Sequence, residues 1–104
     1  MTEAQFGLTG ATGTQSPVVT ATGDIDLANV SEFQDALNKA ASGADALTVD
    51  LSQVSYCDSS AVRALFSVAA NTKLSLLVKS SGPIKTLLSV SGLDRVANVT
   101  MADG

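Results

Sequence analysis

An aspartate followed by two serines lies in the middle of the chain, within Val54–Leu65, V-S-Y-C-D-S-S-A-V-R-A-L. A strand-like pattern ends there and a helix-like pattern begins. Asp58 is suited to cap the new helix, because its carboxylate can accept a hydrogen bond from the amide of Ser60 or Ala61. Ser59 and Ser60 then fall in the first turn, where free amides and the helix dipole favour negative charge. A phosphate added there would be tolerated by the fold and would change what this corner binds.

Residues for the common catalytic sites are missing. The chain has no histidine, so neither serine has an imidazole base, and nucleophilic hydrolysis is not expected. Cys57 is the only cysteine, which disfavours a zinc site, and we interpret it as a small buried residue at a strand end. Three carboxylates at expected strand ends, Asp24, Asp26 and Asp58, could hold Mg²⁺ for phosphoryl transfer, but no phosphate-binding loop accompanies them. We therefore expect a binding protein without a catalytic residue, cofactor or metal of its own.

Charge and hydropathy exclude other classes of partner. Ten acidic and six basic residues give a net charge of -4, which opposes binding to nucleic acid or to an acidic membrane surface. The sequence starts without a basic stretch followed by an apolar run, and no apolar segment approaches the roughly 20 residues that span a bilayer. We expect a single cytoplasmic domain over residues 1–104, without membrane insertion and monomeric when free.

Apolar periodicity and turn residues predict the elements that position the corner. Asn29 and Glu32 have the spacing of a capping box, Pro83 suits a first helical position, and Gly92 suits a helix end. In chain order we predict strands over Ala4–Thr9 and Pro17–Thr22, a helix from Val30 to about Gly43, a strand over Ala46–Leu51, a helix from Ser59 to about Asn71, a strand over Leu74–Lys79, a helix from Pro83 to Gly92, and a strand over Arg95–Met101.

This order, β-β-α-β-α-β-α-β with short connections, indicates an α/β fold. We expect a mixed sheet of about five strands whose later strands are joined by right-handed crossovers. The limited number of apolar residues favours helices packed mainly on one face of the sheet. Five acids lie near expected helix starts and would gather at one end of the molecule, as acids at helix starts commonly do: Asp24, Asp26, Glu32, Asp35 and Asp58.

Three segments together resemble the STAS domain family, in particular bacterial anti-sigma factor antagonists: G-D-I-D-L, L-T-V-D-L-S-Q-V-S-Y-C-D-S-S-A-V-R-A-L and G-P-I-K-T-L-L-S-V-S-G-L. The resemblance runs from the second strand to the last helix. It implies that the unphosphorylated protein binds an anti-sigma factor, itself a serine kinase, which then releases its sigma factor. Phosphorylation of the second serine, Ser60 here, would end this binding, and a phosphatase would reset the switch. ATP and Mg²⁺ would belong to the kinase.

The resemblance also implies site residues. Asp58 matches the acid before the serines, Ser59 the neighbouring hydroxyl, and Asp26 the acid of a turn near the phosphorylation site. The family usually has Gly after the second serine, where this chain has Ala61. Alanine is the better helix former by about 0.8–1 kcal/mol, so the helix should tolerate it, while the added methyl alters the approach of a kinase loop. The expected partner-binding residues are Asp26, Asp58, Ser59, Ser60, Ala61 and Arg63.

Alternatives remain open at this point. Within the same family, the chain could be a STAS subunit that regulates a lipid-transport ABC ATPase, in which phosphorylation plays no part. A Mg²⁺-dependent phosphotransferase built on the three aspartates is a reading from another class. The plainest alternative is that Asp58, Ser59 and Ser60 only cap a helix, and Ser60→Asp would then be nearly silent in a binding assay.

Overall fold

A single sheet forms the frame of the protein. The computed structural model describes residues 5–9, 17–80 and 82–102, and within them five strands lie side by side in chain order. The first pair is antiparallel and each later pair is parallel. The elements are β1 (Gln5–Thr9), β2 (Val18–Ile25), α1 (Val30–Ala41), β3 (Ala46–Cys57), α2 (Ser59–Ala69), β4 (Lys73–Val78), α3 (Pro83–Ser91), the 3-10 turn η1 (Leu93–Arg95) and β5 (Asn98–Met101).

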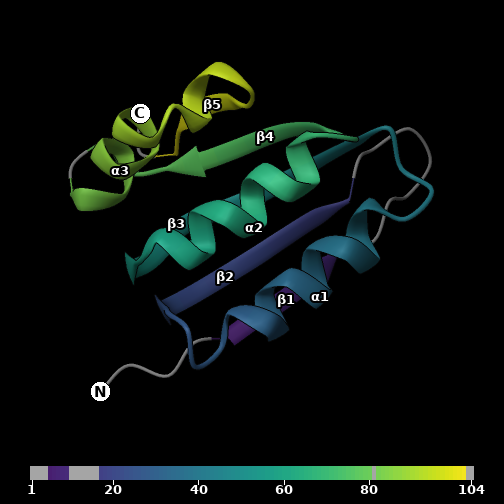
Figure 1. Ribbon diagram of the computed structural model, residues 1–104, viewed down its shortest axis with the longest axis horizontal. Coiled ribbons are helices and arrows are strands. Elements are labelled where there is room, and N and C mark those ends of the chain that lie inside the picture. Colours follow the sequence, from purple (N-terminus) through teal and green to yellow (C-terminus); the bar gives the residue numbers. More distant parts are fainter. Residues whose placement is uncertain (1–4, 10–16, 81, 103–104) are drawn as a thin grey trace.

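The helices cover one face of this sheet. Because the parallel strands follow one another in order, crossovers of the same hand place their helices on the same side. Figure 1 shows α1 and α2 lying in front of the strands. Along β2, Val19, Ala21 and Ile25 are buried on the helical side, while Thr20 and Thr22 are only half-buried on the other. The mixed sheet and its one-sided helical layer confirm the fold predicted from the sequence.

The core lies between the inner face of the sheet and the helices. Aliphatic side chains make up most of it, with Phe33 of α1 as the largest fully buried residue. Burying these apolar surfaces is the dominant force that holds the helices to the sheet. None of the helices in the described ranges is long and apolar enough to cross a membrane. Other fully buried side chains are Ile25, Leu37, Leu47, Leu65, Leu76, Leu88, Leu93, Val19, Val49 and Val78.

The strand before the corner is longer than predicted, because β3 continues past Leu51 to Cys57. Its register with β2 shifts twice, between Thr20 and Thr22 and again between Gly23 and Asp24. At each shift β3 contains one residue more than β2, which is the pattern of a β-bulge. The alternation of side chains is reversed only between the two bulges, where Val54 and not Gln53 is buried, and it is restored by Cys57.

At the first bulge, a local side-chain interaction satisfies the displaced backbone. The amide nitrogen and Oγ of Ser52 both donate to Oδ1 of Asp50, at 2.9 and 2.6 Å. Beyond the second bulge, Tyr56 is exposed and Cys57 is buried opposite Ile25. The bulges therefore bury Val54 in place of Gln53 and Ser55, while the exposed Tyr56 just before Asp58 follows the original alternation of the strand.

Other element ends also differ from the predictions. β2 continues through Gly23, which has a positive φ of 81°, to Ile25. The last strand begins at Asn98 and not at Arg95, because Leu93–Arg95 forms a 3-10 turn anchored by the buried Leu93. α2 ends at Ala69, two residues before Asn71. The predicted Ala4 and the side chains of the first strand lie outside the described residues.

The end of α3 is as predicted. Gly92 follows the helix with φ 82°, a left-handed conformation that suits glycine because it lacks a Cβ atom. Its amide donates to the carbonyl oxygens of Leu88 and Ser89. Leu93 then enters the core directly after the turn.

Candidate functional site

Asp58 caps α2 as the sequence predicts. It has extended backbone angles, and its Oδ1 accepts the amide of Ser60 at 2.9 Å. The Oγ of Ser60 donates to the same oxygen. Ser60 is half-buried and lies outside the hydrophobic core, while Ser59 is exposed. The first turn of α2 therefore presents two hydroxyl groups beside one carboxylate.

The carboxylate of Asp58 is held in its ionised form. The hydrogen bond from the Ser60 hydroxyl is the main cause that lowers the pKa of Asp58. Backbone amides of Ser60, Ala61 and Leu27 also lower this pKa, because each favours the anion. A negative charge thus lies directly beside the Ser60 hydroxyl at neutral pH.

We expect the capping contribution of Asp58 to depend on pH. Since its folded-state pKa lies below the ordinary value of about 3.9, the stabilisation is present above about pH 4 and is lost as pH falls through the folded-state value. Urea unfolding midpoints of wild type and Asp58→Asn from pH 7 to pH 3 test this. Asparagine also caps helices but does not titrate. An advantage of wild type over the variant that is as large at pH 3 as at pH 7 would contradict the assignment.

The loop between β2 and α1 is held against this corner, but not by the predicted capping box. Asn29 makes no side-chain bond to the start of α1. Its Oδ1 instead accepts the amide of Asp26 at 3.0 Å, and its Nδ2 donates to the carbonyl oxygen of Asp24 at 2.8 Å. The capping-box prediction is wrong because Asn29 closes the preceding turn, which fixes Asp26 and the exposed Leu27 next to Asp58.

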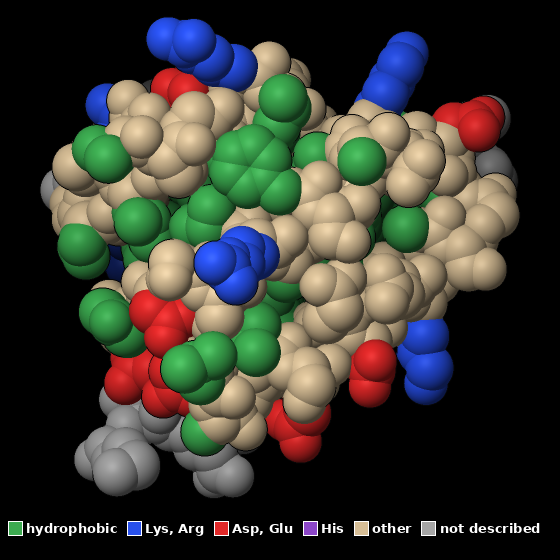
Figure 2. Space-filling model, in the orientation of Figure 1, with side chains coloured by type: hydrophobic (Ala, Val, Ile, Leu, Met, Phe, Trp, Pro, Cys, Tyr) green, Lys and Arg blue, Asp and Glu red, His purple; other side chains and the backbone are tan. Residues whose placement is uncertain are grey.

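Two further bonds complete the connection. The amide of Asp58 donates to the carbonyl oxygen of Ile25 at 3.2 Å, so the end of β2 supports the start of α2. The amide of Ala28 donates to Oδ1 of Asp26 at 2.9 Å. Figure 2 shows acidic side chains gathered at the lower left, near the strand ends and helix starts seen in Figure 1. These bonds place the loop that carries Asp26 against the start of α2, and the approach of Asp26 to the two serines stays a prediction.

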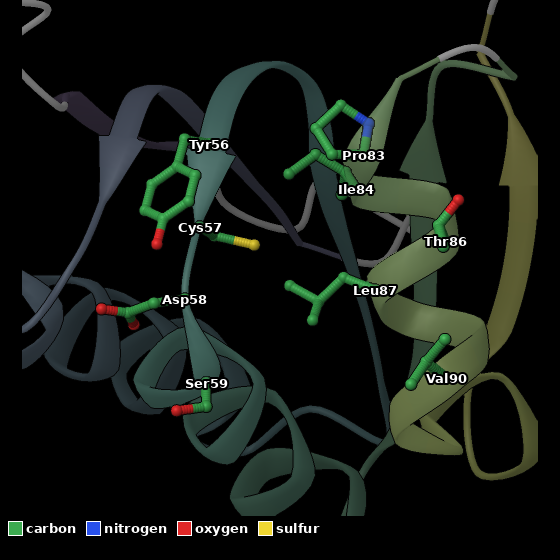
Figure 3. Close-up of a pocket in the computed structure, with 9 residues that line it drawn as sticks. All are labelled: Tyr56, Cys57, Asp58, Ser59, Pro83, Ile84, Thr86, Leu87 and Val90. Atoms are coloured by element: carbon green, nitrogen blue, oxygen red, sulfur yellow. The ribbon is translucent and has the colours of Figure 1, made fainter.

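An apolar groove of about 580 Å³ lies beside the corner, between the end of β3 and α3. Figure 3 shows Cys57 of β3 and Ile84 and Leu87 of α3 directed toward the space between the two elements. The residues that line it are Tyr56, Cys57, Asp58, Ser59, Pro83, Ile84, Thr86, Leu87 and Val90. A helix from Pro83 to Gly92 is predicted from the sequence, but the groove beside it, which we call the α3 groove, is not.

Cys57 is a buried part of the α3 groove. Burial, followed by the charge of Asp58, raises the pKa of its thiol to about 11, so the thiol is protonated at neutral pH. Its sulfur atom points toward α3 in Figure 3. The observed position agrees with the prediction of a small buried residue at a strand end, and a protonated thiol is a poor nucleophile.

The other predicted partner-binding residues lie in different environments. Arg63 is exposed on α2 and faces solvent. Ala61 is only 1 % exposed and packs in the core, so its methyl group is not available to a partner and we remove it from the expected contact surface. The reason is the phase of α2, whose buried face begins at Ala61.

The three-carboxylate arrangement for Mg²⁺ is not formed. Over the described ranges of the chain, no group of three His, Cys, Asp or Glu residues is placed to hold a metal ion. Asp24 contributes its backbone carbonyl to Asn29, and Asp58 uses its carboxylate to cap α2. This geometry removes the structural basis for the phosphotransferase reading.

Comparison with known proteins identifies a matching family model and solved structures of similar fold. The family model described as "Mlab, STAS domain" matches residues 9–101. The structure of an anti-sigma factor antagonist from Mycobacterium paratuberculosis is similar, with a TM-score of 0.81 and 18 % identity over 93 % of this chain and 85 % of that chain. A search of curated protein sequences finds no match.

Two structures of SpoIIAA are also similar in fold. The unphosphorylated anti-sigma factor antagonist SpoIIAA has a TM-score of 0.61 and 18 % identity, over 88 % of this chain and 97 % of that chain. The phosphorylated form, described as a Bacillus cell fate determinant, has the same TM-score and 17 % identity, over 95 % and 94 % of the two chains. The same architecture is thus found in proteins described in both phosphorylation states.

Proposed function

This chain belongs to the STAS domain family, and from that premise we propose that it is a bacterial anti-sigma factor antagonist, which regulates transcription by partner switching. In its unphosphorylated form it binds an anti-sigma factor with serine kinase activity, and the sigma factor is released. Phosphorylation of Ser60 ends this binding, and a phosphatase restores it. The observation that carries the proposal is the Ser60 hydroxyl, which lies outside the core at the start of α2 and beside Asp58.

The position of Ser60 suits a reversible modification. In the transfer, its Oγ would form a bond to the γ-phosphorus of ATP bound to the partner, ADP would leave, and the hydroxyl proton would be released. The positive end of the α2 dipole lies beside the product phosphate and favours its negative charge. The fold can therefore hold the phosphate without unfolding the helix.

The same phosphate would weaken binding through local charge. It would add about −1.5 to −2 charge, and it would replace the hydroxyl that donates to the ionised Asp58. Two neighbouring anions must then remain hydrated, which opposes burial of this corner against a partner. We propose that the contact surface includes Asp26, Asp58, Ser59, Ser60 and Arg63.

The protein would act in the cytoplasm as a binding protein and not as an enzyme. ATP and Mg²⁺ would be supplied by the anti-sigma factor. A net charge of -4 suits contact with a basic protein surface and opposes contact with nucleic acid. We propose that the free protein is monomeric and that its regulated partner is the kinase.

Incubation with each ATP-binding anti-sigma factor of the same genome, in the presence of Mg²⁺ and ATP, tests this function. We expect a mass increase of one phosphate with one of these kinases. Ser60→Ala should abolish the increase, whereas Ser59→Ala, a matched change at the neighbouring and more exposed hydroxyl, should retain it. The assignment fails if no kinase modifies the chain, or if Ser59 carries the phosphate.

A second candidate is a STAS subunit that regulates a lipid-transport ABC ATPase. Two observations favour it. The matching family model is described as "Mlab, STAS domain", without mention of an anti-sigma factor antagonist. The α3 groove is lined by Ser59 and not by Ser60, so a partner can dock there without any modification. Co-purification with an ATPase while Ser60 remains unmodified would support this function over the first.

A further inference from the structure

We propose that the α3 groove receives an apolar side chain of the anti-sigma factor, from a segment that also carries lysine or arginine. This inference rests on the proposed function and deepens it. It adds the groove-facing side of α3 to a contact surface that otherwise surrounds the first turn of α2. The segment would lie across the groove with its basic residues toward Asp58.

The first observation is a cluster of exposed apolar side chains around the α3 groove. Val90 is 80 % exposed on α3, and Tyr56 is 52 % exposed at the end of β3. Both line the groove, and Leu27, also 80 % exposed, projects from the loop whose backbone contacts Asp58. Apart from Val96, these are the exposed large hydrophobic side chains in the described part of the chain. Such clusters commonly mark interaction sites.

The second observation is the charge at the rim. Among the described residues that line the α3 groove, Asp58 is the only charged one, and it is ionised at neutral pH. Asp26 lies in the adjoining loop, held there by Asn29. An apolar floor beside an anionic rim is complementary to a segment that presents an aliphatic or aromatic side chain next to a cation.

A protein segment fits these observations better than a small molecule or a lipid surface. The exposed Leu27 lies outside the lining of the α3 groove, so a ligand confined to the groove would leave it in water. An anionic membrane would be repelled by Asp58 and by the net charge of -4. A docked segment can cover both the groove and its surroundings, and it would lie next to Ser59 and Ser60.

The test compares two adjacent residues of α3. Val90 lines the α3 groove, whereas Ser89 is exposed and lines a different hollow, between α3 and β5. Val90→Asn and Ser89→Asn both leave the net charge unchanged and both lie on the surface, so neither should unfold the protein. The probe is the anti-sigma factor that phosphorylates the wild type, and its Kd is measured by titration calorimetry without ATP.

We expect Val90→Asn to raise Kd about tenfold, because a contacting valine would no longer be buried, and Ser89→Asn to change Kd less than about twofold. Wild-type binding should also weaken with added salt, as expected for a basic segment beside Asp58. Equal affinities of the two variants would overturn the groove assignment while leaving the switch at Ser60 intact. If the wild type binds no anti-sigma factor, both the proposed function and this inference fail.

A second copy of the chain in the α3 groove would give a different experimental result. Analytical ultracentrifugation of the protein alone would reveal a concentration-dependent dimer if a second copy filled the α3 groove. A dimer that Val90→Asn dissociates and Ser89→Asn does not would assign the groove to self-association and overturn the proposal. The expected result is a monomer in all three proteins, with the difference between the variants observed only in the presence of the anti-sigma factor.

Discussion

Ser60→Asp is expected to abolish capture of the anti-sigma factor, whereas Ser60→Ala should bind as the unmodified protein does and resist release by the kinase. The aspartate places a second carboxylate beside the ionised Asp58, and neither can donate a hydrogen bond to the other. Burying both against a partner would cost several kcal/mol, which corresponds to a loss of affinity of more than about a hundredfold.

The measurement is Kd for each variant with the anti-sigma factor, before and after incubation with ATP. Ser67→Asp is a matched control, because Ser67 is exposed near the other end of α2 and the change in net charge is the same. A first-turn aspartate is compatible with the helix dipole, so Ser60→Asp should remain folded. Equal binding by Ser60→Asp and Ser60→Ala would refute the switch and would leave Asp58 and Ser60 as a helix cap alone.

The order of the elements could be predicted from the sequence because it depends on local signals. Pro83 and Gly92 bound α3 as expected, since their backbone preferences do not depend on distant residues. Asp58 caps α2 for the same reason: its carboxylate binds the amide of Ser60, two residues further along. The helices lie on one face because right-handed crossovers between successive parallel strands, taken in chain order, place every connecting helix on the same side of the sheet.

The parts that could not be predicted depend on pairing between distant segments. The two bulges that bury Val54 in place of Gln53 exist only in the register between β2 and β3. Asn29 had a plausible local partner at the start of α1, but the turn from Asp24 to Asp26 satisfies its side chain instead. The α3 groove requires α3 to lie beside the end of β3, and no motif of either segment specifies that distance.

The burial of Ala61 also depends on packing between distant segments and could not be predicted from the sequence. Periodicity predicts the helix itself, and Arg63 and Ser67 are exposed on it. The exact rotation of the helix depends on how it packs on the sheet, which buries Ala61 and Ala64 and leaves Phe66 half-buried. Ala61, which we expected on the contact surface, lies in the core because the helix is rotated by a fraction of a turn from the expected orientation.

Ile25→Ala is expected to destabilise the protein by about 2–5 kcal/mol, a large part of the roughly 5–15 kcal/mol typical of a small domain. Ile25 is fully buried at the end of β2, pairs with Cys57, and supplies the carbonyl that accepts the amide of Asp58. Truncation would leave a cavity directly beneath the corner. Ile25→Val, a matched change that removes one methyl group, should cost only about 0.5–1.5 kcal/mol.

Urea unfolding of the three proteins gives these free energies, provided that the slope of the transition is unchanged. If the corner depends on this support, Ile25→Ala should also be phosphorylated more slowly at temperatures where it is still folded, because Asp58 and Ser60 would lose a fixed position. Ile25→Val should be phosphorylated at the wild-type rate. Equal unfolding free energies for the alanine and valine variants would contradict the burial of the Ile25 side chain, and equal phosphorylation rates would show that this side chain does not hold the start of α2 in place.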